Sequence, residues 1–208
     1  MSTETPKKIA IIIGSTRPNR IGDQVSALIQ SILTSANTDP SYTLHLVDIA
    51  AFNLPVFNEA IMPAMVPAQG EFAHQHSKDW NAEIAKYSAY VFVTAEWNFG
   101  LPGGTKNAID YLYHAWIGKP VMIVSYGIMG GTAASDSLKG TLAGMHMKVV
   151  ETRVNLTFPD ADAANHNMSP GLMGAIGGKL VESVGEKWRE EKGEEIVKAF
   201  AELKEKLA

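Results

Sequence analysis

The chain has 208 residues, 46% of them hydrophobic and 19% charged, which is enough apolar material for a single compact domain over 1–208. Its formal net charge of −4 at pH 7 argues against binding nucleic acid or a membrane surface through bulk positive charge. It contains no cysteine, so disulfides, thiolate metal sites and cysteine nucleophiles are excluded.

The first elements in the chain are a predicted strand over 9–13 and a predicted helix after it. The strand is an unbroken apolar run, mostly β-branched, which is typical of a strand buried on both faces of a parallel sheet. It is too short for a signal peptide or a membrane span, so we expect a cytoplasmic protein. Val25, Ile29 and Leu33 recur at helical spacing and predict the helix.

Strands and helices continue to alternate up to the C-terminus. Further strands are expected at 44–49, 90–94, 121–125 and 149–154, and further helices around 80–87, 105–116, 138–145 and 196–207. Five strands alternating with helices indicate an α/β doubly wound parallel sheet covered on both faces. The second and fifth strands are the most polar and suit the sheet edges, which predicts the strand order 2-1-3-4-5. Residues 52–77 and 158–171 break this rhythm and are expected to be irregular.

Ligands of such a sheet bind beyond the carboxyl ends of the strands, where the strand order reverses. The loops 14–22, 95–104 and 125–131 should meet there. The first loop holds Ser15, Arg17 and Arg20 just before a helix, and this combination suits a phosphate. It matches neither a dinucleotide fingerprint nor a P-loop, so we expect a terminal monophosphate. The alternative is an ordinary helix start with solvated arginines.

The other two loops suit a flat heteroaromatic ring. Trp97 and Phe99 offer aromatic surface, although either of them can instead belong to the core. The glycines of 125–131 expose backbone amides that can donate to ring oxygens, unless the segment is only a flexible turn. No metal site is expected, because His74 and His76 have no third ligand at a useful spacing.

Three groups of residues resemble the NADPH-dependent FMN reductase family, which has a flavodoxin-like fold and includes quinone, azo-dye and chromate reductases. They are Gly14-Ser15-x-Arg17, the residues Glu-Trp-Asn-x-Gly-x-Pro-Gly at 96–103 with Lys-Asn-Ala-Ile-Asp at 106–110, and the segments 118–120 and 125–131. The resemblance implies an enzyme in which FMN takes hydride from NADPH or NADH and passes it to small acceptors such as quinones, free flavin, azo dyes or metal ions. It also implies a homodimer or tetramer, for which 52–77 and 105–116 are candidate interface segments.

The same resemblance implies where the cofactor lies. The phosphate is expected against Ser15, Arg17, Arg20, Ile21 and Gly22, and the ring system against Glu96, Trp97, Asn98, Phe99, Ser125, Tyr126, Gly127 and Gly130. No side chain is expected to be catalytic, because the flavin itself carries the hydride. Two other functions stay open: a flavodoxin-type electron carrier with protein redox partners, and a non-redox module that binds a phosphate ligand.

Overall fold

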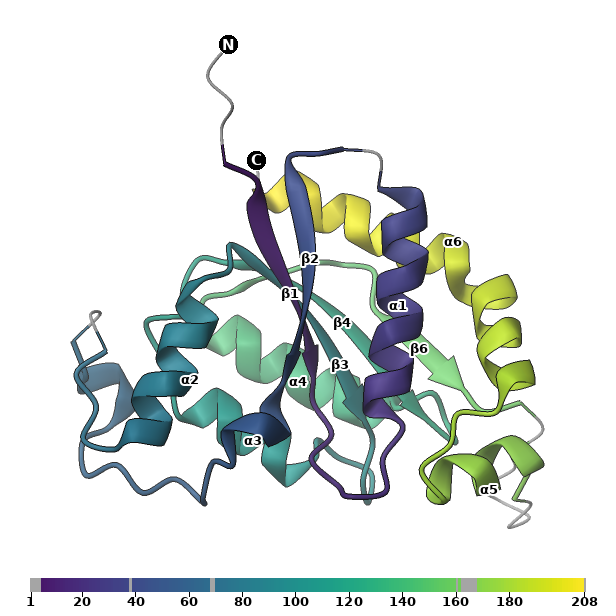
Figure 1. Cartoon of the computed structure of the whole chain (residues 1–208), viewed down its shortest axis with the longest axis horizontal. Coiled ribbons are helices and arrows are strands. Elements are labelled where there is room, and N and C mark those ends of the chain that lie inside the picture. Colours follow the sequence, from purple (N-terminus) through teal and green to yellow (C-terminus); the bar gives the residue numbers. More distant parts are fainter. Residues whose placement is uncertain (1–4, 38, 68–69, 160, 162–167, 208) are drawn as a thin grey trace.

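The computed structural model describes residues 5–37, 39–67, 70–159, 161 and 168–207. Within these ranges the centre of the molecule is a parallel six-stranded sheet. Its strands are β1 (Lys7–Ile13), β2 (Tyr42–Asp48), β3 (Ala89–Ala95), β4 (Pro120–Gly127), β5 (Lys148–Val149) and β6 (Val154–Thr157). They are ordered β2-β1-β3-β4-β5, and β6 pairs with β4 beyond the end of β5. Figure 1 labels all of these strands except the short β5. The predicted order 2-1-3-4-5 is confirmed.

The central strands are apolar throughout because each of them contributes side chains to a hydrophobic core on both faces of the sheet. Successive side chains of a strand point to opposite faces. Ile9 and Ile11 therefore enter the core on one face of the sheet, whereas Ala10 and Ile12 enter the core on the other. β3 and β4 alternate in the same way, while the edge strand β2 is mostly half-exposed. The predicted assignment of central and edge strands is confirmed.

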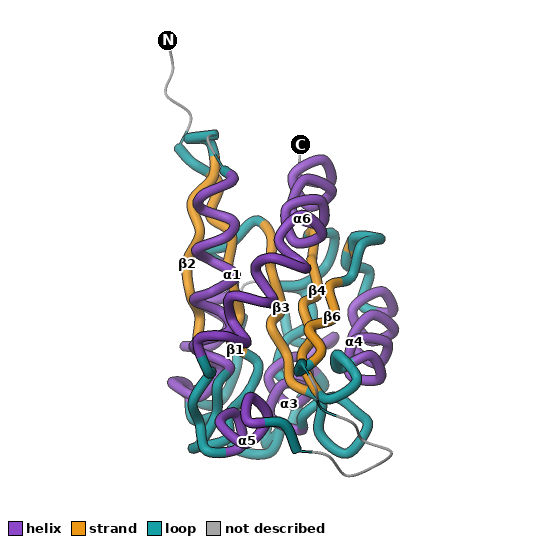
Figure 2. The backbone as a smooth tube through the Cα atoms, turned by 90° about the vertical axis from the view of Figure 1, so that its right-hand side faces the viewer, coloured by secondary structure: helices purple, strands orange, loops and turns teal. Residues whose placement is uncertain are grey.

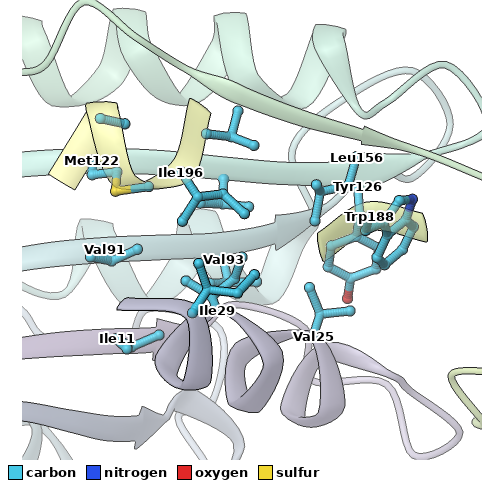
Figure 3. Close-up of a cluster of buried hydrophobic side chains, with 14 of the residues drawn as sticks. Ile11, Val25, Ile29, Val91, Val93, Met122, Tyr126, Leu156, Trp188 and Ile196 are labelled. Atoms are coloured by element: carbon cyan, nitrogen blue, oxygen red, sulfur yellow. The ribbon is translucent and has the colours of Figure 1, made fainter. Parts of the chain in front are cut away.

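Helices cover both faces of this sheet (Figures 1 and 2). One face carries α1 (Gly22–Ala36), α5 (Pro170–Ile176) and α6 (Glu182–Leu207), and the other carries α2 (Gln75–Ala85), α3 (Gly103–Asp110) and α4 (Thr132–Gly144). Figure 3 shows the first core, where side chains of α1 and α6 meet those of the strands. In the described ranges, no helix combines the length and apolar character that crossing a membrane requires.

The predicted helix over 105–116 is shorter in the structure and ends at Asp110. The carbonyls that would continue it are engaged by two buried indoles: Trp80 Nε1 donates to Ala108 O at 2.8 Å, and Trp116 Nε1 donates to Ile109 O at 3.2 Å. The apolar residues after Asp110 fill the core from turns. These residues are therefore spaced as they would be in a helix, although they do not form one.

The predicted fifth strand, 149–154, is split into β5 and β6. Between them the backbone amide of Thr152 donates to the carboxylate of Glu202 on α6 at 2.9 Å, so the chain bonds to a helix rather than to the sheet at this residue. The irregular stretch 52–77 contains two short 3₁₀ turns, η1 (Ile49–Phe52, which overlaps its start) and η2 (Pro63–Met65), and the beginning of α2. The stretch 158–171 lies partly outside the described residues, and α5 begins near its end.

A half-buried lysine next to the first residue of β4 gives a testable pH dependence. Lys119 Nζ donates to the hydroxyl of Tyr90 at 2.8 Å, and burial lowers the pKa of Lys119 to about 8. An unfolded lysine titrates near ~10.4, so between these values the unfolded chain binds more protons and stability rises with pH. We expect wild type to gain unfolding free energy relative to Lys119→Met from about pH 8 to about pH 10.4. Urea titrations at several pH values measure this, and parallel curves would contradict it.

Candidate functional site

The three loops that the sequence predicts to converge do meet at the carboxyl ends of β1, β3 and β4. Thr105 Oγ1, on α3, donates to Gly14 O at 2.7 Å and joins the first loop to the second. The backbone amide of Glu96 donates to Tyr126 O at 3.1 Å and joins the second loop to the third. All three lie at the end of the molecule to which the strand arrows point (Figure 1).

A cavity of about 230 Å³ opens where the loops meet. Predicted site residues that line it are Ser15, Arg17, Arg20, Ile21, Glu96, Trp97, Tyr126 and Gly127. Lining residues that the sequence analysis missed are Ala95, Ile128, Phe158, Met168, Leu172, Ala175 and Ile176. Most of the missed residues are apolar and follow β6, so their place at the cavity depends on tertiary packing. The predicted residues Gly22, Asn98, Phe99, Ser125 and Gly130 do not line it.

The first loop leads into the N-terminus of α1. α1 begins at Gly22, and its N-cap residue Ile21 provides no side-chain cap, so the first amides of the helix carry no side-chain acceptor. Arg17 is exposed and donates from Nη2 to Ala175 O at 3.2 Å. It can turn toward an anion at this helix end by giving up one neutral hydrogen bond.

Arg20 lines the same cavity but uses its guanidinium to shape the loop. Its Nη1 donates to Ser15 O at 2.7 Å, and its Nη2 forms an ion pair with the carboxylate of Asp48. Asp48, at the carboxyl end of β2, was missed by sequence reasoning. The signal that could have found it is an acidic residue that ends the strand next to the first loop.

Gly22 packs against two residues that line the cavity, Ser15 and Tyr126. A Cβ atom at Gly22 would lie 3.1 Å from the Tyr126 hydroxyl oxygen and 3.2 Å from Ser15 Cβ, so glycine allows these groups to approach. Burial raises the pKa of Tyr126 to about 12, although the Ser15 hydroxyl and the charge of Arg17 act in the opposite direction. The phenol therefore stays protonated at neutral pH and can donate a hydrogen bond.

Glu96 lies at the cavity but directs its carboxylate to the N-terminus of α4. Oε2 accepts from the backbone amides of Ala133 at 2.8 Å and Ala134 at 3.2 Å. The positive end of α4 is thus already neutralised by a side chain. The N-terminus of α1, in contrast, has no side-chain cap.

Removing the carboxylate of Glu96 should weaken α4. We expect Glu96→Ala to lower the free energy of unfolding by about 1 kcal/mol, the usual cost of losing an N-terminal cap. Glu96→Gln keeps an acceptor oxygen and should recover part of that loss. Denaturant titration of the two variants measures the difference, and an alanine variant as stable as wild type would show that the cap contributes nothing.

The second loop reverses direction in a tight turn at 97–100. Trp97 and Gly100 exchange two backbone hydrogen bonds of 3.0 Å, and the two residues between them, Asn98 and Phe99, have φ values of 48° and 60°. This left-handed pair is typical of a type I′ turn, where glycine usually takes the second position. Trp97 is half-buried at the cavity, whereas the Phe99 side chain is 83% exposed.

The third loop is held in shape by Ser125 and Gly130. Ser125 Oγ donates to Gly130 O at 2.8 Å and accepts from Asn155 Nδ2 at 2.7 Å. Gly130 and Gly131 have φ values of 73° and 72°, which glycine adopts without strain. Both predicted residues thus act inside the loop and position Gly127, which reaches the cavity.

The strand order and the place of the cavity define a flavodoxin-like α/β protein. Residues 7–159 match the model of the family described as NADPH-dependent FMN reductase. The chain belongs to this family, and the resemblance found in the sequence is confirmed.

The names of individual relatives are consistent with this family assignment. The chain is 45% identical over 201 residues to a NAD(P)H-dependent FMN reductase of Nectria sp., with 96% of both chains covered. It is 33% identical over 147 residues to a NAD(P)H-dependent FMN reductase of Saccharomyces cerevisiae, covering 69% of this chain and 77% of the relative. Among solved structures, the flavoenzyme NAD(P)H:(acceptor) oxidoreductase FerB of Paracoccus denitrificans has a TM-score of 0.59 at 20% identity, covering 94% of this chain and 97% of FerB. That likeness shows the fold.

Proposed function

We propose that this chain is an FMN-dependent NAD(P)H oxidoreductase that passes hydride from a nicotinamide to small acceptors such as quinones. Membership in the NADPH-dependent FMN reductase family supports the proposal. The observation that carries it is a single cavity that brings together the uncapped N-terminus of α1, the guanidinium of Arg17 and the indole of Trp97. A helix end and an arginine suit a phosphate, and an aromatic wall suits a flat ring.

The residues present fit FMN. Ser15, Arg17 and the first amides of α1 would hold the phosphate, while Trp97 and Gly127 would hold the ring system. When bound, FMN supplies the chemistry, because it accepts hydride from a nicotinamide and gives it to an acceptor. The protein orients the ring, keeps water from its apolar side through Ile128 and its neighbours, and provides hydrogen-bond donors. Of the predicted cofactor residues, Arg20, Ser125 and Gly130 would act through the shape of the loops.

An absorption spectrum of the purified protein tests this function. After supplementation with FMN and removal of excess flavin, the spectrum should show a flavin band near ~450 nm, and NADPH should bleach it. NADH is tested in parallel to establish which nicotinamide is preferred. A protein that takes up no FMN would contradict the proposal and favour a non-redox module.

The electron carrier differs from the reductase in its reaction with nicotinamide. A carrier binds FMN but does not oxidise NADPH on its own, so consumption of NADPH with a quinone and no other protein separates the two functions. The relatives named as reductases favour the enzyme. We further propose a single domain over 1–208 and a cytoplasmic location. We also propose a homodimer or tetramer, and sedimentation of the purified protein would test this oligomeric state.

A further inference from the structure

One wall of the cavity comes from a part of the chain that the family model does not cover. The match to that model ends at residue 159. Met168, Leu172, Ala175 and Ile176, which lie on α5 or just before it, nevertheless line the cavity. The alignment with the Nectria relative covers 96% of both chains and so includes this segment, whereas the S. cerevisiae alignment covers 69% of this chain. The wall therefore lies outside the residues that the family model matches.

Three hydrogen bonds attach this wall and the residues after it to the first loop and the start of α1. Arg17 Nη2 donates to Ala175 O at 3.2 Å. Gln24 makes the other two: its Nε2 donates to Gly178 O at 2.9 Å, and its Oε1 accepts from Leu180 N at 2.8 Å. Gln24 lies on α1, is half-buried and does not line the cavity. Its amide therefore pins the segment that joins α5 to α6.

α5 packs tightly against α6 on one side, whereas side chains on its cavity side are partly exposed. A Cβ atom at Gly171 would lie 2.4 Å from Val184 Cγ2, so α5 lies close against α6. In contrast, the side chains of Met168 and Ile176 are 57% and 44% exposed although they border the cavity. An apolar molecule held against α5 would remove these side chains from water, which favours its retention.

We propose that α5 forms a wall that retains the bound flavin, and that Gln24 is the positioning residue that holds this wall in place. The proposal rests on the proposed function, since FMN is taken as the occupant of the cavity. Apolar residues on α5 or just before it line one side of the cavity, so a loosened α5 would open a route for release. Changes of this kind act mainly on the rate of dissociation.

The rate of FMN release from full-length protein tests the role of Gln24. Wild type, Gln24→Ala, Gln24→Glu and Gln30→Ala are loaded with FMN, and released flavin is collected by timed ultrafiltration. Gln30 is the matched control, because it lies half-buried on the same helix and its Nε2 donates to Leu44 O at 3.2 Å, on β2. Gln24→Ala should release FMN about tenfold faster than wild type, since it loses two hydrogen bonds.

The other variants separate positioning from general destabilisation. Gln30→Ala should release FMN at the wild-type rate, and Gln24→Glu, which can still accept from Leu180 N, should lie between wild type and Gln24→Ala. Equal release from Gln24→Ala and Gln30→Ala would overturn the role of α5 while leaving the reductase intact. Failure of wild type to bind FMN would instead overturn the proposed function and, with it, the flavin wall.

Discussion

Replacing Arg17 by alanine is expected to weaken FMN binding by about 10- to 100-fold. A hydrogen bond to a charged group contributes roughly 1.5–3 kcal/mol, and Arg17 is the arginine of the first loop whose guanidinium is not engaged by a carboxylate in the described structure. The phosphate would have to be held by Ser15 and the helix amides alone. Titration of the flavin-free protein with FMN, followed by flavin fluorescence, measures the change.

Riboflavin distinguishes a phosphate contact from an indirect effect. It lacks the phosphate, so Arg17→Ala should leave its affinity close to that of wild type. If the variant weakened riboflavin and FMN equally, the hydrogen bond from Arg17 to Ala175 would be the important one, and Arg17 would act through α5. Arg189→Ala serves as the matched control, because this exposed arginine of α6 donates to Ser31 Oγ at 3.1 Å, away from the cavity.

The second large effect is expected from Trp188→Ala. Trp188, labelled in Figure 3, is 1% exposed, packs against Phe158 with ring centroids 5.2 Å apart, and donates from Nε1 to Thr157 O at 2.7 Å. Truncating a buried tryptophan costs about 3–5 kcal/mol because it leaves a cavity. We expect a loss of this size in the free energy of unfolding, measured by urea titration.

Phenylalanine at position 188 separates the two contributions. Trp188→Phe keeps an aromatic ring against Phe158 but loses the hydrogen bond to Thr157 O, and it should cost clearly less than alanine. Because Phe158 lines the cavity, Trp188→Ala should also weaken FMN binding. An alanine variant within about 1 kcal/mol of wild type would mean that this part of the core readily collapses around the missing indole.

The sheet could be predicted from the sequence because its central strands carry a local signal. Unbroken apolar runs mark β1, β3 and β4, and polar residues mark the edges. The end of α3 could not be predicted, since it depends on the indole of Trp80, which is distant in sequence from Ala108. The division of the last strand likewise depends on Glu202. The start of α5 carries a recognisable signal, Ser169 followed by Pro170, because serine is a common N-cap and proline suits the first helical position.

The candidate site was predictable where it depends on the ends of strands. The topology alone brings the three loops together, so residues such as Ser15 and Trp97 could be assigned from the order of elements. The apolar wall could not, because Phe158 and Leu172 reach the cavity only through the packing of α5 and α6. Sequence reasoning also could not tell which arginine is engaged: Arg20 and Arg17 are equivalent in composition, and only the structure places Asp48 beside one of them.

The left-handed turn after β3 has a consequence for how another molecule would contact the surface of this loop. The phenyl group of Phe99 stands in water, yet the direction of its Cα–Cβ bond is set by the main-chain hydrogen bonds that close the turn. The direction in which the Phe99 side chain leaves the backbone is therefore fixed without packing by neighbouring side chains. A molecule that contacts Phe99 would restrict the rotation of one side chain but would not have to order the backbone of a loop. The loss of conformational entropy on binding is therefore small.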